Sequence, residues 1–384
     1  MIRILELRSV RGTGGGPEKT ILAGAAYADP ARFAVTVCYI RDVRDAVFSM
    51  KGRADDHGVA YVEVTERHSF DVSVWPALKK LVRQLKIDIV HAHDYKTNVL
   101  TSLLGRSQSI IPLSTVHGWT GHSSRERYLY YPFDKRVLRT FPRLIAVSGE
   151  IRDELVRHGA KPARVSVVLN GIDPAKFRRV PDRCAFAREA FRYGPEDVVI
   201  GSVGRLEPQK RFDLLISAFA RIREVHPALR LIIAGDGSER PALQRQIDQL
   251  GLGAVCRLPG HHADIVEFHH LLDLFVQSSV YEGTPNVVLE AMAMETPIVA
   301  TAAGGTAELM RDGTDGLVVE PGNLTALYDA MNVALNDRAA AAARVQAARA
   351  RVEGELSFSA RMAAIERIYE ELVASVRSGV MQSR

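Results

Sequence analysis

The chain has 384 residues, which is too long for one ordinary hydrophobic core and fits two domains of about 170 to 190 residues each. With 47% hydrophobic and 25% charged residues, it has the composition of a folded globular protein. Its 50 basic and 45 acidic residues are interspersed and leave a net charge of +5, so its surface field is weak. A small phosphate-bearing ligand suits this balance better than a nucleic acid, and we expect no nucleic-acid partner.

The N-terminal segment and the cysteines indicate the cellular compartment of the protein. The N-terminus, MIRILELRSV, alternates like a β-strand and lacks the apolar core and cleavage site of a signal peptide. No apolar run reaches the roughly 18 residues that a spanning helix needs. Cys38, Cys184 and Cys256 form no CxxC pair and indicate neither a disulfide framework nor a zinc site. We expect a cytoplasmic protein that meets a membrane, if at all, at its inner face.

Short runs rich in β-branched residues recur between helical patterns along the whole chain. In the first half they are MIRILEL, FAVTVCYI, IDIVHAH, PLSTVHG, RLIAVSG and VSVVLNG, and in the second VVIGSVG, LRLIIAG, AVCRLPG, LDLFVQS, TPIVATA and GLVVEPG. Strands that alternate with helices form parallel sheets covered on both faces, and ligands bind beyond the carboxyl ends of their strands. The pattern predicts an α/β protein with two doubly wound, Rossmann-like domains that face each other across a cleft.

Punctuating residues place the domain boundaries. A polar connection containing Pro174, Pro181 and Pro195 separates the two sets of strands, which predicts domains over residues 1–178 and 179–357. Apolar residues keep a three-four spacing between Phe358 and Val376, which indicates one amphipathic helix. We expect segment 358–384 to carry this helix back toward the N-terminal domain and to end in a mobile tail.

A glycine-rich turn follows the first strand. The segment VRGTGGGPEKT departs from a dinucleotide fingerprint at Pro17 and from a Walker loop at Glu18. Three consecutive glycines before a helix remain, and their bare backbone can approach an anion. A tight turn that only needs positive φ explains them equally well.

Two cations follow the first strand of the second half. In GSVGRLEPQKRFDLL, Arg205 and Lys210 stand five positions apart in a proline-containing loop. Such a pair can hold a diphosphate and neutralise the charge that grows on it as a leaving group. The alternative is a pair of solvated loop cations, the commoner fate of either residue taken alone.

Two glutamates stand eight positions apart in the otherwise apolar segment SSVYEGTPNVVLEAMAMETPIVAT. Glu282 is expected in a turn at the carboxyl end of a strand, and Glu290 one turn into a helix that starts near Pro285 and Asn286. A carboxylate in an apolar helix needs a partner, which the hydroxyls of a sugar or ribose would supply. Alternatively, Glu290 pairs with a structural cation such as Arg205 or faces solvent.

Two further segments each leave a choice. In HAHDYKTN, His91 and His93 share one face of a strand with Asp94 beside them, a spacing that some metal sites use. A polar cluster at a strand end is the more common meaning, and we expect no metal; His261, His262, His269 and His270 receive no side-chain role. Segment 123–143 interleaves basic and aromatic residues, which fits either contact with an anionic membrane or an ordinary surface helix.

Several of these motifs occur together in an order that resembles a known family. GRLEPQKRFDLLISAF, AGDGSERPAL, YEGTPNVVLEAMAMETPIVAT, GGTAEL and DGLVVEPGN look like the C-terminal half of the retaining glycosyltransferases of family 4, the group 1 enzymes with the GT-B fold. GGGPEKT, TVHGW, AVSGEIRDEL and VLNGID agree with the N-terminal half. The resemblance covers nearly the whole chain and implies a nucleotide-sugar donor domain over 179–357 and an acceptor-side domain over 1–178.

The resemblance also implies residue roles on the donor. Glu282 would lie by the donor sugar, Glu290 would bind the ribose, and Arg205 and Lys210 would grip the diphosphate. The donor would further be contacted by backbone groups of Gly15, Gly16, Gly260, Asn286 and Val287.

The catalytic set implied by the family is completed by His117, which would approach the sugar and the acceptor. With Glu282, Arg205 and Lys210 it forms the group expected to carry the reaction. One departure is the turn after Glu282, where Gly-Thr-Pro-Asn replaces the Gly-Phe-Gly of many relatives, so any contact of that aromatic ring is missing.

The implied function is retaining transfer of a hexose-type sugar from a UDP or GDP sugar, without a metal or other cofactor. The acceptor would be a glycan or a lipid-linked molecule of surface polysaccharide or glycolipid synthesis. Two alternatives remain: a nucleotide-sugar 2-epimerase of the same fold, and a non-catalytic sugar-nucleotide sensor. The presence of Arg205, Lys210, Glu282 and Glu290 together argues against a sensor.

Overall fold

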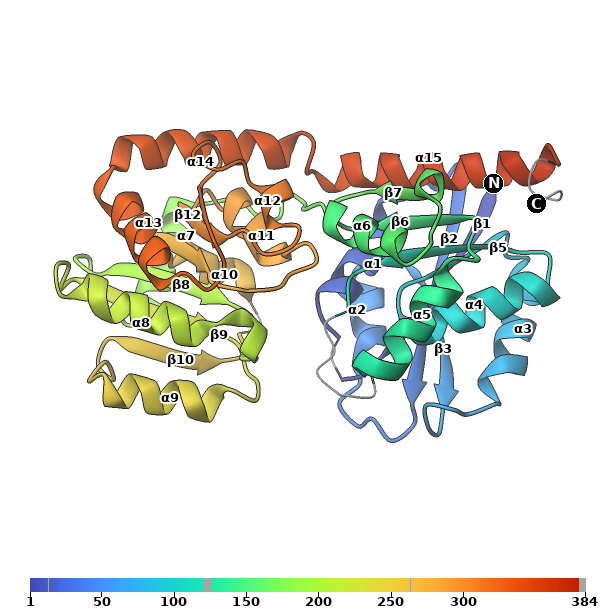
Figure 1. Cartoon of the computed structure of the whole chain (residues 1–384), viewed down its shortest axis with the longest axis horizontal. Coiled ribbons are helices and arrows are strands. Elements are labelled where there is room, and N and C mark those ends of the chain that lie inside the picture. The colour runs from blue at the N-terminus through green and yellow to red at the C-terminus, as the bar shows by residue number, and fades with distance from the viewer. Residues whose placement is uncertain (13, 120–125, 263, 380–384) are drawn as a thin grey trace. The chain divides into compact units, whose positions relative to one another are not determined.

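The computed structural model describes residues 1–12, 14–119, 126–262 and 264–379 (Figure 1). The chain forms two compact units: unit 1 comprises Met1–Asn170 and Phe358–Arg384, and unit 2 comprises Gly171–Ser357. The expected boundary between residues 178 and 179 falls inside unit 2, because Ile172 forms a parallel bridge with Ser357 at the start of this unit. The tail expected to be mobile, 380–384, lies outside the described residues.

Unit 1 contains a sheet of seven parallel strands in the order β3-β2-β1-β4-β5-β6-β7. The strands are β1 (Ile2–Val10), β2 (Phe33–Asp42), β3 (Ala60–Glu66), β4 (Ile89–Ala92), β5 (Ile111–Val116), β6 (Arg143–Ala146) and β7 (Val165–Val167). The strand order reverses between β1 and β4, so this pair forms the switch point where doubly wound sheets bind ligands. Glu6 of β1 lies opposite His91 of β4 in the register.

Helices cover both faces of this sheet (Figure 1). They are α1 (Gly16–Tyr27), α2 (Met50–Asp56), α3 (Val74–Leu85), α4 (Tyr95–Ser107), α5 (Tyr131–Leu138), α6 (Gly149–Arg157) and α15 (Phe358–Arg377), with a π-helical turn at Glu126–Tyr130 and a 3-10 turn at Pro162–Arg164. The apolar stripe of α15, including Met362, Ile365 and Tyr369, packs on Ile4 and Ile89. The last helix therefore completes the core of unit 1.

Unit 2 contains a sheet of six parallel strands in the order β10-β9-β8-β11-β12-β13. The strands are β8 (Val198–Val203), β9 (Leu229–Ala234), β10 (Cys256–Gly260), β11 (Leu274–Gln277), β12 (Ile298–Thr301) and β13 (Leu317–Val319). The helices are α7 (Pro181–Ala190), α8 (Phe212–Arg223), α9 (Arg240–Gln249), α10 (Ile265–His270), α11 (Asn286–Ala293), α12 (Thr306–Leu309), α13 (Leu324–Asn336) and α14 (Arg338–Glu353), with a 3-10 turn at Pro208–Lys210. The switch point here lies between β8 and β11.

The core of unit 2 follows from its sequence pattern. Leu215 and Phe219 of α8 are fully buried with Leu231 of β9 and Met331 of α13, and they belong to one apolar cluster on one face of the sheet. Elsewhere in unit 2, α11 packs against α14. Burying whole apolar faces in this way contributes roughly 25 cal/mol for each Å² of apolar surface removed from water.

The structure confirms the prediction of two doubly wound parallel sheets, and every β-branched run quoted above contains a strand. One strand was not predicted: β3, at the edge of the unit 1 sheet, is only partly buried along most of its length. Within the part of the chain that the structure describes, no helix is both long and apolar enough to cross a membrane.

Candidate active site

The carboxyl ends of β8 and β11 bring together residues that are far apart in the sequence. Lys210 follows β8 in the 3-10 turn, and Glu282 lies in the turn after β11. The two loops are tied directly, because Val280 N donates to Gln209 O at 2.9 Å and Ser278 Oγ donates to Lys210 O at 2.8 Å. The switch point of the unit 2 sheet therefore positions a cation beside a carboxylate.

Glu282 is held by three donors. Its Oε1 accepts hydrogen bonds from Lys210 Nζ at 2.6 Å, from Ser279 Oγ at 2.6 Å and from Gln277 Nε2 at 3.4 Å. The residue is only 8% exposed. A carboxylate so fixed keeps one orientation, and Lys210 is fixed with it, so neither group has to reorganise when a ligand arrives.

Arg205 lies in the same loop as Lys210 but reaches solvent. Its side chain is exposed, and among the described residues its guanidinium group has no hydrogen-bond or ion-pair partner. The preceding Gly204 packs on Lys210, since a Cβ at Gly204 would lie 3.4 Å from Lys210 Cε. An exposed arginine next to an anchored lysine is an arrangement that can receive a diphosphate.

Two glycines of the segment AGDG allow it to pack directly against the backbone of the loop that carries Arg205. Gly235 has a φ of +147°, and a Cβ there would lie 1.8 Å from Gly204 O. A Cβ at Gly237 would lie 2.4 Å from Leu206 O. Because no side chain fits at either position, the two glycines permit the close approach of the loops on either side of Arg205.

Glu290 lies in α11, as expected, but its neighbour was not expected. The carboxylate is 4% exposed, and His269 Nε2 lies 3.6 Å from Glu290 Oε2. Of the suggested alternatives, exposure to solvent is wrong, because Glu290 is buried; a structural partner is present, but among the described residues it is not Arg205. His269, to which no role was assigned, is fully buried beside Glu290.

The remaining residues predicted for the donor in unit 2 are backbone positions. Asn286 and Val287 are the first two residues of α11, and no side chain of Pro285, the residue before them, caps the helix. Gly260 ends β10 with a φ of +89°, and its carbonyl accepts a hydrogen bond from Gly235 N at 2.8 Å. Gly260 is thereby connected to the loop that supports Arg205.

The glycine loop of unit 1 already contains a carboxylate. Gly15 N donates to Glu18 Oε2 at 2.6 Å, and Arg8 Nε donates to Glu18 Oε1 at 2.5 Å. Burial would raise the pKa of Glu18, but the Arg8 charge and the Gly15 amide outweigh it and lower the pKa. Gly16 begins α1, so Glu18 caps the helix at the position predicted to approach a phosphate.

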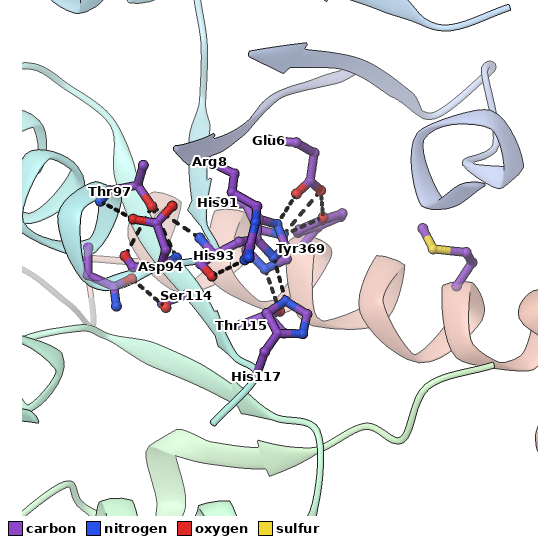
Figure 2. A network of polar contacts seen from close by, with 12 residues as sticks. Glu6, Arg8, His91, His93, Asp94, Thr97, Ser114, Thr115, His117 and Tyr369 are labelled. Carbon is purple, nitrogen blue, oxygen red and sulfur yellow. Dashed lines mark hydrogen bonds and ion pairs between the residues drawn. The ribbon is translucent and has the colours of Figure 1, made fainter. Parts of the chain in front are cut away.

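A cluster of buried polar side chains lies at the switch point of the unit 1 sheet (Figure 2). Glu6 of β1 contacts His91 Nδ1 through Oε1 at 3.2 Å, and its Oε2 hydrogen-bonds to His93 Nε2. Tyr369 of α15 donates to Glu6 Oε1 at 2.8 Å. His93 Nδ1 lies 3.1 Å from Nε2 of His117, which directly follows β5.

The side chains of this cluster include possible metal ligands, which tests the alternative that the histidines form a metal site. One ligand atom each from Glu6, His91 and His93 lies within 4.8 Å of the others, so these residues could hold a cation. Asp94 does not take part as suggested, because it caps α4 by accepting from Lys96 N and Thr97 N. The cluster also lines a cavity of about 10 Å³, room for one water, together with the buried Arg361. A guanidinium at this cavity disfavours a second cation.

Comparison of the sequence with known proteins then identifies the family. The profile described as "Glycosyl transferases group 1" matches residues 186–351, and that described as "Glycosyltransferase Family 4" matches residues 14–176. The chain is 31% identical over 306 residues to the glycogen synthase of Mycobacterium tuberculosis, an alignment that covers 76% of this chain and 71% of that protein. The chain is a group 1 glycosyltransferase. It is also 32% identical over 271 residues to the D-inositol 3-phosphate glycosyltransferase of Kribbella flavida, covering 65% of this chain and 63% of that one.

Solved structures agree on the fold of this glycosyltransferase. The Anabaena protein Alr3699/HepE, in complex with UDP, superposes with a TM-score of 0.83 at 22% identity, covering 96% of this chain and all of that chain. Sucrose-phosphate synthase from Thermosynechococcus elongatus gives a TM-score of 0.80 at 21% identity, covering 97% of this chain. With its two doubly wound sheets, the glycosyltransferase has the GT-B fold.

Sequence reasoning missed three residues near the predicted site of this glycosyltransferase. Glu6 was overlooked although a carboxylate in the middle of an apolar strand is itself a signal. Tyr369 was read only as part of the apolar stripe of α15, and His269 only as one histidine among several. The partners of all three come from other elements, so only the fold reveals them.

Proposed function

We propose that this glycosyltransferase transfers a hexose-type sugar from a nucleoside-diphosphate sugar with retention of configuration. The acceptor is a glycan or a lipid-linked molecule used for surface polysaccharide or glycolipid synthesis. The observation that carries the proposal is the Lys210–Glu282 pair with the exposed Arg205 at the switch point of unit 2. Cations for a diphosphate and a fixed carboxylate for a sugar thus share one edge of the sheet.

The proposed donor site assigns a contact to each part of the ligand. Arg205 and Lys210 neutralise the diphosphate, together with the start of α11 at Asn286 and Val287. Glu282 binds hydroxyls of the sugar, and Glu290 binds the ribose. Gly260 contacts the base, and Gly15 and Gly16 contact the phosphates; the Glu18 carboxylate has to release the Gly15 amide before that amide can bind an anion.

The reaction follows from where charge develops. As the bond between the sugar and the diphosphate breaks, negative charge grows on the phosphate oxygens and positive charge on the sugar ring. Arg205 and Lys210 stabilise the first, and Glu282 faces the second. The acceptor hydroxyl enters from the face that the phosphate leaves and gives its proton to the phosphate, while His117 orients the sugar and the acceptor.

Glu282 fits this front-face route better than a double displacement. Its Oε1 accepts hydrogen bonds from Lys210, Ser279 and Gln277, which favour the ionised carboxylate, and a fixed negative charge can offset the positive charge that develops on the sugar. The two cations supply the charge that a metal would supply in other transferases, so we propose a reaction that needs no metal or other cofactor.

The nucleotide is proposed by analogy. Structures of the Anabaena protein Alr3699/HepE contain UDP, UDP with glucose, and UDP-glucose. A UDP sugar is therefore the first donor to test, with GDP sugars second. The glycosyltransferases named above act on different acceptors, so the acceptor is proposed only as a class.

Donor binding is tested by thermal unfolding with UDP-, GDP- and ADP-glucose in the presence of EDTA. A donor at 100 times its Kd should stabilise the protein by about 2.7 kcal/mol. We expect one nucleotide class to do so, and Arg205→Ala and Glu290→Ala to abolish the effect. Arg221→Ala, which removes an exposed arginine from the last turn of α8, is the matched control and should leave the shift intact.

The products of an acceptor screen separate the reaction classes. Transfer requires that the donor sugar appears on the acceptor. Conversion of the donor to its 2-epimer without any acceptor would indicate the epimerase instead, and failure of every nucleotide to bind would overturn both.

Membrane contact is proposed for part of segment 123–143, of which residues 123–125 lie outside the described residues. Tyr128, Leu129 and Phe133 are 74%, 61% and 52% exposed, and Arg136 is exposed close to them. Apolar side chains beside a cation favour the surface of an anionic bilayer at the cytoplasmic face. Co-sedimentation with phosphatidylglycerol vesicles, reduced by Leu129→Ser with Phe133→Ser, is the expected result; equal sedimentation of the variant would exclude this surface.

A further inference from the structure

We infer that Glu6, acting through His93, fixes the tautomer of His117 so that His117 Nδ1 offers a lone pair to a substrate hydroxyl. Glu6 and His93 are then positioning residues that no substrate touches. The inference rests on the proposed function for the identity of the hydroxyl, which belongs to the donor sugar. The arrangement of the three side chains is independent of that function.

The donor and acceptor roles in this chain of hydrogen bonds can be assigned by starting from Glu6. This carboxylate is buried, and burial raises its pKa, but His91 and His93 outweigh burial and hold the pKa well below its usual range. Glu6 is therefore ionised and can only accept hydrogen bonds. His93 Nε2, which contacts Glu6 Oε2, must carry the proton and donate it.

The second link follows from the charge of His93. Burial, with help from the neighbouring His91, lowers the pKa of His93 to about 4, so the ring is neutral at physiological pH. A neutral imidazole has one N–H, and here Nε2 carries it. Nδ1 of His93 is then an acceptor, and the group 3.1 Å away, His117 Nε2, must be the donor.

The third link leaves an unshared lone pair on His117, the last of the three side chains. Burial, followed by the nearby His93, lowers the pKa of His117 well below its usual range, so this ring is neutral as well. With its proton on Nε2, His117 has an unprotonated Nδ1. Figure 2 shows one ring nitrogen of His117 turned toward His93 and the other turned away from the cluster. His93 is 5% exposed, whereas His117 is only partly buried, so His117 is the member that reaches the surface.

The other side of Glu6 is occupied by a second set of bonds. Tyr369 donates to Glu6 Oε1 at 2.8 Å and lies 2.9 Å from His91 Nδ1, from which it accepts. His91 Nε2 then accepts from Thr115 Oγ1 at 2.7 Å. Because Oε1 is held by Tyr369, Oε2 is reserved for His93, and each group in the network has a consistent donor or acceptor role.

The consequence for the reaction is that His117 selects a substrate group that can donate a hydrogen bond. A hydroxyl can donate to the bare Nδ1 of His117, whereas an Nδ1–H would compete for the hydroxyl oxygen and turn its proton elsewhere. Because the acceptor hydroxyl gives its proton to the phosphate, the hydroxyl that donates to His117 is one on the sugar, and this hydrogen bond holds the sugar in one orientation for the reaction. No proton has to leave the network during this step.

The test measures the tautomer directly. Long-range ¹H–¹⁵N spectra of histidine-labelled full-length protein in EDTA should show His117 protonated at Nε2 and unprotonated at Nδ1. In Glu6→Gln, the amide oxygen keeps the Tyr369 bond and the amide nitrogen donates to His93 Nε2. Both rings then reverse, and His117 should become protonated at Nδ1. We expect kcat for sugar transfer to fall about 100-fold or more, as wrong-tautomer variants of catalytic histidines do, while the Kd for UDP stays within about threefold of wild type.

Thr115→Val is the matched control, because it removes a hydrogen bond from the same buried network but from the His91 side. It should leave the His117 spectrum and kcat as in the wild type. Protonated Nδ1 in wild-type His117, an unchanged His117 tautomer in Glu6→Gln, or a reversed tautomer with wild-type kcat would each overturn the inference. Absence of any transfer by the wild type would instead refute the proposed function, and the wild-type spectrum would still decide the tautomer, even if Glu6→Gln did not fold.

Discussion

Replacing Lys210 with methionine is expected to lower kcat/KM for sugar transfer by about 100- to 1,000-fold, the range for losing one group that stabilises charge in a transition state. Lys210 Nζ lies 2.6 Å from Glu282 Oε1, and Lys210 belongs to the same loop as Arg205. Methionine keeps the length and apolar stem of lysine but removes the charge. The loss should therefore appear in the chemical step rather than in folding.

Steady-state kinetics with a saturating acceptor, together with a denaturation curve, measure both effects. Lys176→Met, at an exposed lysine of the same unit, is the control and should keep wild-type kinetics. In Glu282→Gln the partner carboxylate is neutral, so the effect of Lys210→Met should not simply add to it. A value of kcat/KM within about threefold of wild type for Lys210→Met would show that Lys210 does not act on the leaving group.

Replacing Gly235 with alanine is expected to cost about 3 kcal/mol of unfolding free energy and to abolish the thermal shift with the donor. The added Cβ would stand 1.8 Å from Gly204 O, and the residue has a φ of +147°. Either the loop bearing Arg205 or the end of β9 has to move. The phosphate site would lose its arginine without any change in a charged residue.

Gly251→Ala separates the two causes of this loss. Gly251 also has positive φ, +67°, but nothing lies within 4 Å of its Cβ position. We expect it to cost only about 1 kcal/mol, the penalty for a left-handed conformation, and to keep the donor shift. If Gly235→Ala bound the donor as tightly as Gly251→Ala does, the close approach of the two loops would have no bearing on Arg205.

Most of the fold could be predicted because buried parallel strands are continuous apolar runs bounded by turn residues. The exception, β3, has the sequence AYVEVTE, in which the polar residues Glu63 and Thr65 alternate with Val62 and Val64, a pattern that fits an edge strand with only one covered face. The long helix α15 was predicted from its spacing, and it begins at Phe358 as expected. Partial burial alone does not prevent prediction, because the edge strands β10 and β13 are also partly buried and their apolar runs were recognised.

The site was less predictable, because a motif names a residue but not its neighbours. The sequence placed Glu290 in a helix, yet its neighbour His269 comes from α10, which only the sheet topology brings close. The glycine loop was recognised, but the bond between Gly15 and Glu18 depends on local backbone geometry. Contacts across elements need the fold before they can be inferred.

The position of α15 has a consequence for the newly synthesised chain. The ribosome makes β1 before unit 2 and α15 after it, yet Met362 and Ile365 of α15 pack against Ile4 of β1. Unit 2 is continuous and can close as it emerges, whereas the sheet of unit 1 keeps an apolar face bare until translation reaches the last helix. A prematurely terminated product that lacks α15 would expose that apolar face, so chaperones would bind it. Its Glu6 would also lack the hydrogen bond from Tyr369, so the hydrogen-bond network of His91 and His93 would be incomplete.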